Sequence, residues 1–254
     1  MLKGFTDIHS HTLWKMDDGA SSFGETLDMC SIAEECETSR LFVTPHLMYW
    51  DQAEELCDLR DEKADYLSDV LADHGSELEI VKGFEILCDD EIFDIKYFRP
   101  YTLNESRYIL IEFDFFKTRG DDVLSWCRYL KSFGLVPVIA HPERYGFVIN
   151  DLPVLDRLSE MGALFQVNAG SPVGVFGDDA MNISCKMFDA GYVDFLGSDA
   201  HKSSIRNTDM LSFFEDYPYN ISEEEIKRIA VNNADFIISD KILVPNRKKS
   251  MKEM

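Results

Sequence analysis

Short apolar runs alternate with helical patterns along the whole chain. The runs lie near residues 5–9, 40–44, 79–85, 107–113, 135–140, 163–168 and 193–198. Runs of this length predict buried strands, and the helical patterns between them predict connections between parallel neighbours. Seven strands in a chain of 254 residues favour a closed barrel over an open doubly wound sheet. We therefore expect an α/β fold, a (β/α) barrel, in a single domain that spans residues 1–254.

Polar residues and glycines mark the ends of the predicted helices. The pairs Ser22 with Glu25 and Ser222 with Glu225 both have the spacing of capping boxes. Three helical patterns are followed by a glycine that can end a helix, at Gly134, Gly162 and Gly191.

The composition is typical of a soluble globular protein, with 45% hydrophobic and 28% charged residues. No apolar run approaches the roughly 18 residues that a membrane span needs. The first residues, MLKGFTDIHSH, lack the long apolar stretch of a secretory signal, so we expect a cytoplasmic protein. The tail 241–254 is polar and basic after Pro245, and we expect it to fray in solvent.

The charge balance disfavours polyanionic partners. The formal net charge is −22, which repels nucleic acid at long range. Bound divalent cations would offset part of this charge and give a phosphate group a locally positive site.

Two common ways of handling phosphate are excluded by the sequence. It has no GxGxxG or Walker loop, and the nearest string, GSPVGVFG at 170–177, has the wrong spacing for either. Thiolate phosphatases need Cys-x5-Arg, and no cysteine of this chain has an arginine six positions later. The cysteines form no CxxC pair and mostly lie in apolar segments, as reduced buried thiols do: Cys30, Cys36, Cys57, Cys88, Cys127 and Cys185.

Histidines gather at the ends of the predicted strands. Of the six in the chain, only His74 lies elsewhere, and we expect it to be an ordinary surface residue. The other five lie at a strand end or just past it: His9, His11, His46, His141 and His201. The carboxyl ends of barrel strands converge on one face, so these side chains are expected to meet and to bind metal.

Carboxylates lie at the ends of other predicted strands, at positions equivalent to those of the histidines. Glu85, Glu112 and Asp199 each follow apolar residues that should be buried. A buried carboxylate needs a partner, either a cation or tight hydrogen bonds, and a salt bridge is an equal alternative for Glu112 alone. Asp18 can reach the same face from the loop MDDGA, although spacing does not separate it from Asp17.

Spacing along the strands strengthens the metal hypothesis. Residues at i and i+2 of an extended strand point to the same side, so His9 with His11 and Asp199 with His201 each form a two-ligand set.

Two arginines follow the strand-end histidines and are candidates for binding a phosphoryl group. Arg144 and Arg206 both fall in strand-to-helix loops on the expected active face. Guanidinium groups match phosphate oxygens in a bidentate way, and the alternative is a surface ion pair.

The sequence motifs of this chain resemble those of a known family. TDIHSH, MDDGA, TPH, GFEI, LNESRYILIEF, VIAHPERY, QVNAGS and GSDAH occur in the order of the polymerase and histidinol phosphatase (PHP) superfamily. The combination of DDGxxS with SRYxLIEF is similar to its capsule-type bacterial tyrosine phosphatases. The resemblance runs from about Phe5 to the helix around 232–238, and it implies a distorted (β/α)7 barrel with three divalent metal ions, manganese in this branch, although iron or zinc suit the same ligands.

The resemblance also implies how the ligands are shared. His9, His11, Glu85 and Asp199 would hold one metal, with Glu85 bridging to a second that Glu112 and His141 hold. Asp18, His46 and His201 would hold the third, and Arg144 and Arg206 would bind the phosphate. The expected reaction is hydrolysis of a phosphomonoester by a metal-bridged hydroxide, on a phosphotyrosine protein such as a bacterial tyrosine kinase of capsule or exopolysaccharide synthesis.

This sequence differs from the capsule-type tyrosine phosphatases at positions that could contact the substrate. A second basic residue often follows the histidine of TPH, whereas LMYW follows it here, and IRNT lacks the proline often found after the arginine. Four aromatic residues could line a rim for an aryl ester or pack internally: Trp14, Tyr49, Trp50 and Tyr145. Two other functions stay open, a small-molecule phosphatase such as one for histidinol phosphate, and a non-enzymatic metal-stabilised module.

Overall fold

The strands form a curled parallel sheet in the computed structural model, which describes residues 3–217 and 221–254. One hydrogen-bonded group has the order β1 (Phe5–Ser10), β2 (Thr38–Val43) and β4 (Glu79–Lys82). The other has the order β3 (His46–Leu47), β5 (Glu85–Leu87), β6 (Tyr108–Glu112), β7 (Val136–Ala140), β8 (Leu164–Asn168) and β9 (Phe195–Gly197). Every pairing between these strands is parallel.

The two groups meet where β9 lies beside β1. Ser10 forms a parallel bridge with Ala200, and the amide of Asp199 donates to the carbonyl of His9 at 2.9 Å. The amide of His11 then donates to the carbonyl of Ala200 at 2.8 Å. The sheet is therefore curled so that the carboxyl ends of distant strands share one edge, which is the feature that the barrel prediction required.

Each of the seven predicted runs contains a strand, with two differences in detail. The run 79–85 is divided into β4 and β5 at Gly83, where an added Cβ would lie 2.7 Å from Cδ2 of Leu103. The short strand β3 was not predicted, because a two-residue strand after Pro45 has no periodicity to detect.

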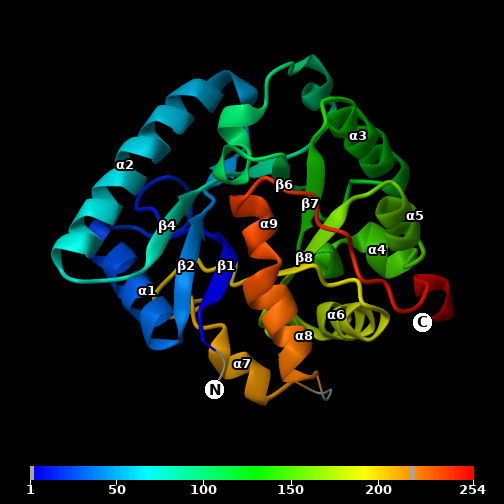
Figure 1. The fold of residues 1–254 in the computed structure, drawn as a ribbon. Coiled ribbons are helices and arrows are strands. Elements are labelled where there is room, and N and C mark those ends of the chain that lie inside the picture. The colour runs from blue at the N-terminus through cyan, green and yellow to red at the C-terminus, as the bar shows by residue number, and fades with distance from the viewer. Residues whose placement is uncertain (1–2, 218–220) are drawn as a thin grey trace.

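Most of the helices lie around the outside of the sheet, whereas the helix of residues 234–238 lies between β1 and β8 and packs on the inner side (Figure 1). The helices are α1 (Phe23–Glu35), α2 (Ala53–Asp73), α3 (Gly120–Ser132), α4 (Gly146–Asn150), α5 (Val154–Glu160), α6 (Asp178–Ala190), α7 (Leu211–Glu215), α8 (Glu223–Lys227) and α9 (Ala234–Ile238). Ser22 and Ser222 are N-caps as predicted, because their hydroxyls accept from the amides three residues later. The reciprocal half of each predicted capping box does not form in the described structure: the carboxylate of Glu25 accepts from Ser21, and that of Glu225 accepts from Arg228. Gly134, Gly162 and Gly191 all have positive φ, which lets the chain leave each helix.

The interior of the curled sheet is apolar up to the level of the strand ends. Tyr108 and Leu110 of β6 pack there with Val138 and Leu164, and α9 contributes Ile237. Since side chains alternate along a strand, Glu112 lies on the same side of β6 as Leu110, one step nearer the carboxyl edge. A buried apolar layer therefore supports polar side chains at that edge.

The C-terminal tail is packed against the body, so the expectation that it frays is wrong. After α9 it crosses to the side of α5 and α6 (Figure 1). Arg247 forms hydrogen bonds of 2.8 and 3.0 Å with the carboxylate of Asp194, and Met251 is only 1% exposed. The basic residues of the tail therefore meet acidic partners far away in the sequence.

The described helices lack the features of a membrane span. Over the ranges that the structure describes, none is both long and apolar enough to cross a bilayer.

Candidate metal centre

The nine predicted metal ligands lie together at the carboxyl edge of the sheet. The first strands contribute His9 and His11 of β1, His46 of β3, Glu85 of β5 and Glu112 of β6. His141 follows β7, Asp199 and His201 follow β9, and Asp18 comes from the loop after β1. They form four overlapping groups in which the ligand atoms all lie within 4.8 Å of one another.

Glu85 is the centre of this cluster. Its side chain is buried, and Oε1 lies 2.8 Å from Nε2 of His141. The second oxygen, Oε2, lies 3.1 Å from Nε2 of His9, 3.2 Å from Nε2 of His11 and 3.1 Å from Nδ1 of His46. Nevertheless this Oε2 has no hydrogen bond from any residue that the structure describes, and a buried carboxylate oxygen without one is rare. Imidazole nitrogens gathered round such an oxygen are a donor set that fits divalent cations.

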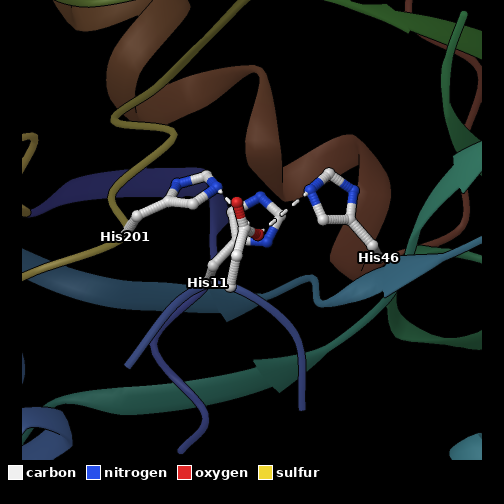
Figure 2. A group of neighbouring side chains, drawn as sticks. His11, His46 and His201 are labelled. Carbon is white, nitrogen blue, oxygen red and sulfur yellow. Dashed lines mark ion pairs between the residues drawn. The ribbon is translucent and has the colours of Figure 1, made fainter. Parts of the chain in front are cut away.

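A second group lies on the solvent side of the first. His11, His46 and His201 turn their rings toward one another (Figure 2). Oδ1 of Asp18 lies 3.6 Å from Nε2 of His46 and 3.5 Å from Nε2 of His201, while the Asp18 side chain is 74% exposed. This group matches the third ligand set that the resemblance implies, with His11 added.

His46 also faces the interior of the site. Its Nδ1 lies 2.8 Å from Oε1 of Glu112 without a hydrogen bond, so this buried nitrogen has no aligned partner within the described part of the chain. His46 thus joins Glu85 and Glu112 in one group, and His141 joins His9 and Glu85 in another. The resemblance instead groups Glu112 with His141.

Asp17 and Gln166 orient the two histidines of β1. Nδ1 of His11 lies 2.7 Å from Oδ2 of Asp17, and Nδ1 of His9 lies 2.9 Å from Oε1 of Gln166. Both rings therefore point Nε2 at Glu85. Carboxylate or amide partners of this kind fix the tautomer and the orientation of a metal-binding imidazole. The geometry also distinguishes the two aspartates that spacing could not separate, because Asp17 contacts His11 and Asp18 faces His46 and His201.

Electrostatics keep the central carboxylates charged. Burial opposes the charge of Asp17, but the His11 ring and the amides of His46 and Gly19 outweigh it and lower the pKa of Asp17 to about 2. Burial likewise opposes the charge of Glu85, and the surrounding histidines, His9 first, hold its pKa well below the usual range.

Asp199 joins the metal ligands to the two arginines. Its Oδ2 accepts from Nη1 of Arg144 at 2.9 Å and lies 2.6 Å from Nη2 of Arg206. Nδ2 of Asn168 donates to the same oxygen at 2.8 Å. Oδ1 of Asp199 is left facing Nε2 of His11, at 3.6 Å. Both predicted arginines therefore lie at the cluster, half-buried beside it.

Three residues of the site have a strained backbone. φ is 33° at His141, 52° at Asp199 and 52° at Arg206, in the left-handed region that non-glycine residues seldom adopt. Strain of this kind costs about 1–3 kcal/mol per residue and concentrates at functional sites. The surrounding hydrogen bonds hold all three in place.

Sequence reasoning missed the supporting residues Gln166 and Asn168. They lie two residues apart at the end of β8, and the side chain of Gln166 donates to that of Asn168 at 2.9 Å. The signal that singled out the histidines, a polar residue at a strand end, was present here too. Of the four aromatic candidates for the rim, Tyr145 is buried and Trp50 packs on Phe98 and Tyr101.

Comparison with known proteins identifies the family of this chain. The family model described as "Capsular polysaccharide synthesis, CpsB/CapC" matches residues 5–239. The tyrosine-protein phosphatase YwqE of Bacillus subtilis is 34% identical over 203 residues, 79% of each chain. The tyrosine-protein phosphatase CpsB of Streptococcus pneumoniae is 26% identical over 253 residues, 93% of this chain and 99% of its own.

A solved structure extends the likeness to the fold. It comes from a study of YwqE from Bacillus subtilis and CpsB from Streptococcus pneumoniae, described as unique metal-dependent tyrosine phosphatases. The two chains superpose with a TM-score of 0.81 at 29% identity, over 96% of this chain and 99% of the other. The match of the family model over most of the chain, together with these relatives, shows that the protein belongs to the CpsB/CapC family of capsular polysaccharide synthesis.

Proposed function

We propose that this protein is a metal-dependent phosphatase that hydrolyses phosphotyrosine on a protein of capsule or exopolysaccharide synthesis, a bacterial tyrosine kinase in the cytoplasm. The observation that carries the proposal is Oε2 of Glu85, a buried oxygen that lies among three imidazole nitrogens and accepts no hydrogen bond from the described residues. The names of the relatives supply the substrate class, since YwqE and CpsB are tyrosine-protein phosphatases.

The donor set fits three divalent ions in a distorted seven-stranded barrel. His9, His11, Glu85 and Asp199 would hold the first, Glu112 and His141 with Glu85 the second, and Asp18, His46 and His201 the third. Nitrogen and carboxylate donors of this kind suit manganese, and they also admit iron or zinc. Such cations would stabilise the charge on the phosphoryl group and lower the pKa of the attacking water.

The other residues of the chain bind and orient the substrate. Arg144 and Arg206 are partly exposed at the cluster, where their guanidinium groups can donate to phosphate oxygens in place of water. Asp199 holds both groups from the interior side. Asp17 and Gln166 fix the rings of His11 and His9, so that little reorganisation is needed when the substrate binds.

Covalent catalysis by cysteine has no place in this proposal. None of the chain's cysteines has the Cys-x5-Arg spacing. Burial raises the pKa of the Cys30 and Cys127 thiols to about 12, so neither is a thiolate at neutral pH.

The test is a substrate panel on chelator-treated protein. Manganese, iron, zinc or cobalt is added back, and phosphate release is measured from phosphotyrosine peptides, phosphoserine peptides and histidinol phosphate. We expect metal-dependent turnover with the tyrosine peptides as the best substrates. Faster turnover of histidinol phosphate would indicate the small-molecule phosphatase instead. No turnover with any metal would leave only the non-enzymatic module.

A further inference from the structure

A pocket of about 530 Å³ opens directly beside the metal cluster. Its polar end is formed by Asp18, His46 and Glu112, which are three of the proposed metal ligands. Its other wall contains the apolar side chains of Met48, Leu56 and Phe115. The size lies within the range of ligand-binding pockets, and it far exceeds what a phosphate group alone would fill.

Part of the apolar wall, Met48, comes from the segment in which this chain departs from the branch. After His46 the sequence is LMYW, where a basic residue is often found. Trp50 turns inward onto Phe98 and Tyr101, whereas Met48 is 42% and Tyr49 59% exposed at the pocket. Apolar side chains that gather at the surface next to a polar site are typical of ligand-binding grooves.

Phe115 connects this wall to the arginines. Its ring stacks on His141, with centroids 5.6 Å apart and an interplanar angle of 22°. The guanidinium carbon of Arg144 lies 4.8 Å from the centre of the same ring. Phe115 therefore both lines the pocket and contacts Arg144, so a group bound in the pocket lies near the proposed phosphate position.

We propose that the pocket formed by Met48, Leu56 and Phe115 binds the aromatic ring of the leaving group, and so selects aryl over alkyl phosphate esters. The inference rests on the proposed function and deepens it, because it assigns the choice of ester to residues of this chain. An aryl ring attached to the phosphate oxygen can cover the wall, and methionine sulfur contacts aromatic rings favourably. A seryl or threonyl ester is too short to cover it.

The experiment compares binding and turnover in Met48→Asn and wild type. Calorimetry on the manganese-loaded protein measures the affinity of phenylphosphonate and of methylphosphonate, neither of which is hydrolysed. Initial rates measure kcat/KM for phenyl phosphate and glycerol phosphate. The matched control is Met161→Asn, at the end of α5 before β8 begins and hence at the opposite end of the sheet.

We expect wild type to bind phenylphosphonate more tightly, and Met48→Asn to reduce that preference about fivefold to tenfold, because the shorter polar side chain buries less apolar surface against the ring. KM for phenyl phosphate should rise with kcat little changed, and the values for methylphosphonate and glycerol phosphate should stay as in wild type. The proposal that the pocket binds the ring would be wrong if wild type bound the two phosphonates with equal affinity. It would also be wrong if Met48→Asn lost the same factor of affinity for both phosphonates. Ring-dependent binding with no turnover of any ester would support the pocket and overturn the proposed function.

Discussion

Oδ2 of Asp17 lies 2.7 Å from Nδ1 of His11, which leaves Nε2 of the same ring facing the carboxylates of Glu85 and Asp199. The aspartate also accepts hydrogen bonds from the amides of Gly19 and His46, each at 2.9 Å. One carboxylate thus ties the loop after β1 and the start of β3 to a single imidazole.

Asp17→Asn should weaken metal binding without unfolding the protein. An amide retains the shape of the carboxylate but loses its charge, so His11 is held less firmly in the tautomer that presents Nε2 to the metal. Loss of such a partner typically costs 10–100-fold in metal affinity, and we expect about that loss for manganese or zinc. Competition with a chromogenic chelator measures it. Asp28→Asn, exposed on α1, is the matched control and should bind as wild type does. An unchanged affinity in Asp17→Asn would show that the contact does not orient the ring for metal.

The sequence could place most of the site because strand ends are local features. Apart from Asp18, the histidines and carboxylates of the cluster lie at or just past the end of an apolar run. Parallel strands bring such ends together whatever the details of the loops. The roles of Asp17 and Asp18 could not be separated, since they depend on how the loop folds back on β1. There Ala20 donates to the carbonyl of His11 at 3.1 Å, and a Cβ on Gly19 would come within 2.2 Å of that oxygen.

The pattern of hydrophobic and polar residues could not predict the parts of the fold that depend on contacts between residues far apart in the sequence. The tail looked like a solvated segment because its own residues are polar and basic. Its position is set by Asp194, Asp156 and Glu225, which are far away in the sequence. The junction of the two strand groups similarly depends on the bridge between Ser10 and Ala200, in which neither residue has a distinctive side chain.

Removing metal should destabilise the protein. Without cations the buried carboxylates of Glu85 and Asp199 rely on histidine protons and on the arginines for compensation. A ligand at about 100 times its Kd stabilises the folded state by about 2.7 kcal/mol. At roughly 2–4 °C per kcal/mol for a chain of this size, the melting temperature should fall by about 5–10 °C with a chelator and recover with manganese.

The response to metal should depend on the central carboxylate. Thermal scans of Glu85→Gln should show little change on adding manganese, whereas Glu79→Gln, exposed on β4, should respond as wild type does. A wild-type melting temperature that is the same with chelator and with manganese would contradict a structural contribution from the metals.

Phe176 should position both arginines for phosphate. The centre of its ring lies 4.7 Å from the guanidinium carbon of Arg144 and 5.3 Å from that of Arg206. The residue comes from GSPVGVFG, the loop that has the wrong spacing for a nucleotide cradle. Each such contact contributes about 0.5–1 kcal/mol, so loss of both in Phe176→Leu should raise KM and the inhibition constant of inorganic phosphate by about fivefold to thirtyfold, with a smaller change in kcat.

Two further variants separate positioning from general damage. Phe176→Tyr keeps the ring and should restore the phosphate affinity, while Phe116→Leu, which changes a 95% exposed side chain near the site, should have no effect. If Phe176→Leu bound phosphate as well as wild type does, the ring would have no part in holding the arginines.

Attachment of the tail should weaken at acid pH through Asp156. This buried carboxylate accepts hydrogen bonds from the hydroxyls of Tyr192 and Ser250 and from the amides of Met251 and Lys252. Burial alone would raise its pKa, but these hydrogen bonds, Tyr192 first, outweigh burial and lower it. Because the pKa is lower in the folded state, the stabilisation is fully present above the unfolded-state pKa of about 3.9 and is lost as the pH falls through the folded value.

Urea unfolding of wild type and Asp156→Asn between pH 3 and 7 tests the sign of this effect. An asparagine cannot accept all four donors, so the variant should be less stable by about 1–3 kcal/mol near neutral pH. The difference in free energy of unfolding between wild type and variant should stay constant down to about pH 5. It should shrink below about pH 4, because Asp156 becomes protonated in wild type whereas the asparagine of the variant does not titrate. Asp189→Asn loses only the half-exposed pair with Lys249 and should differ from wild type by about 0.5 kcal/mol or less. A gap between wild type and Asp156→Asn that widened toward acid pH would mean that the folded-state pKa of Asp156 is raised and that the carboxylate does not anchor the tail as an ion.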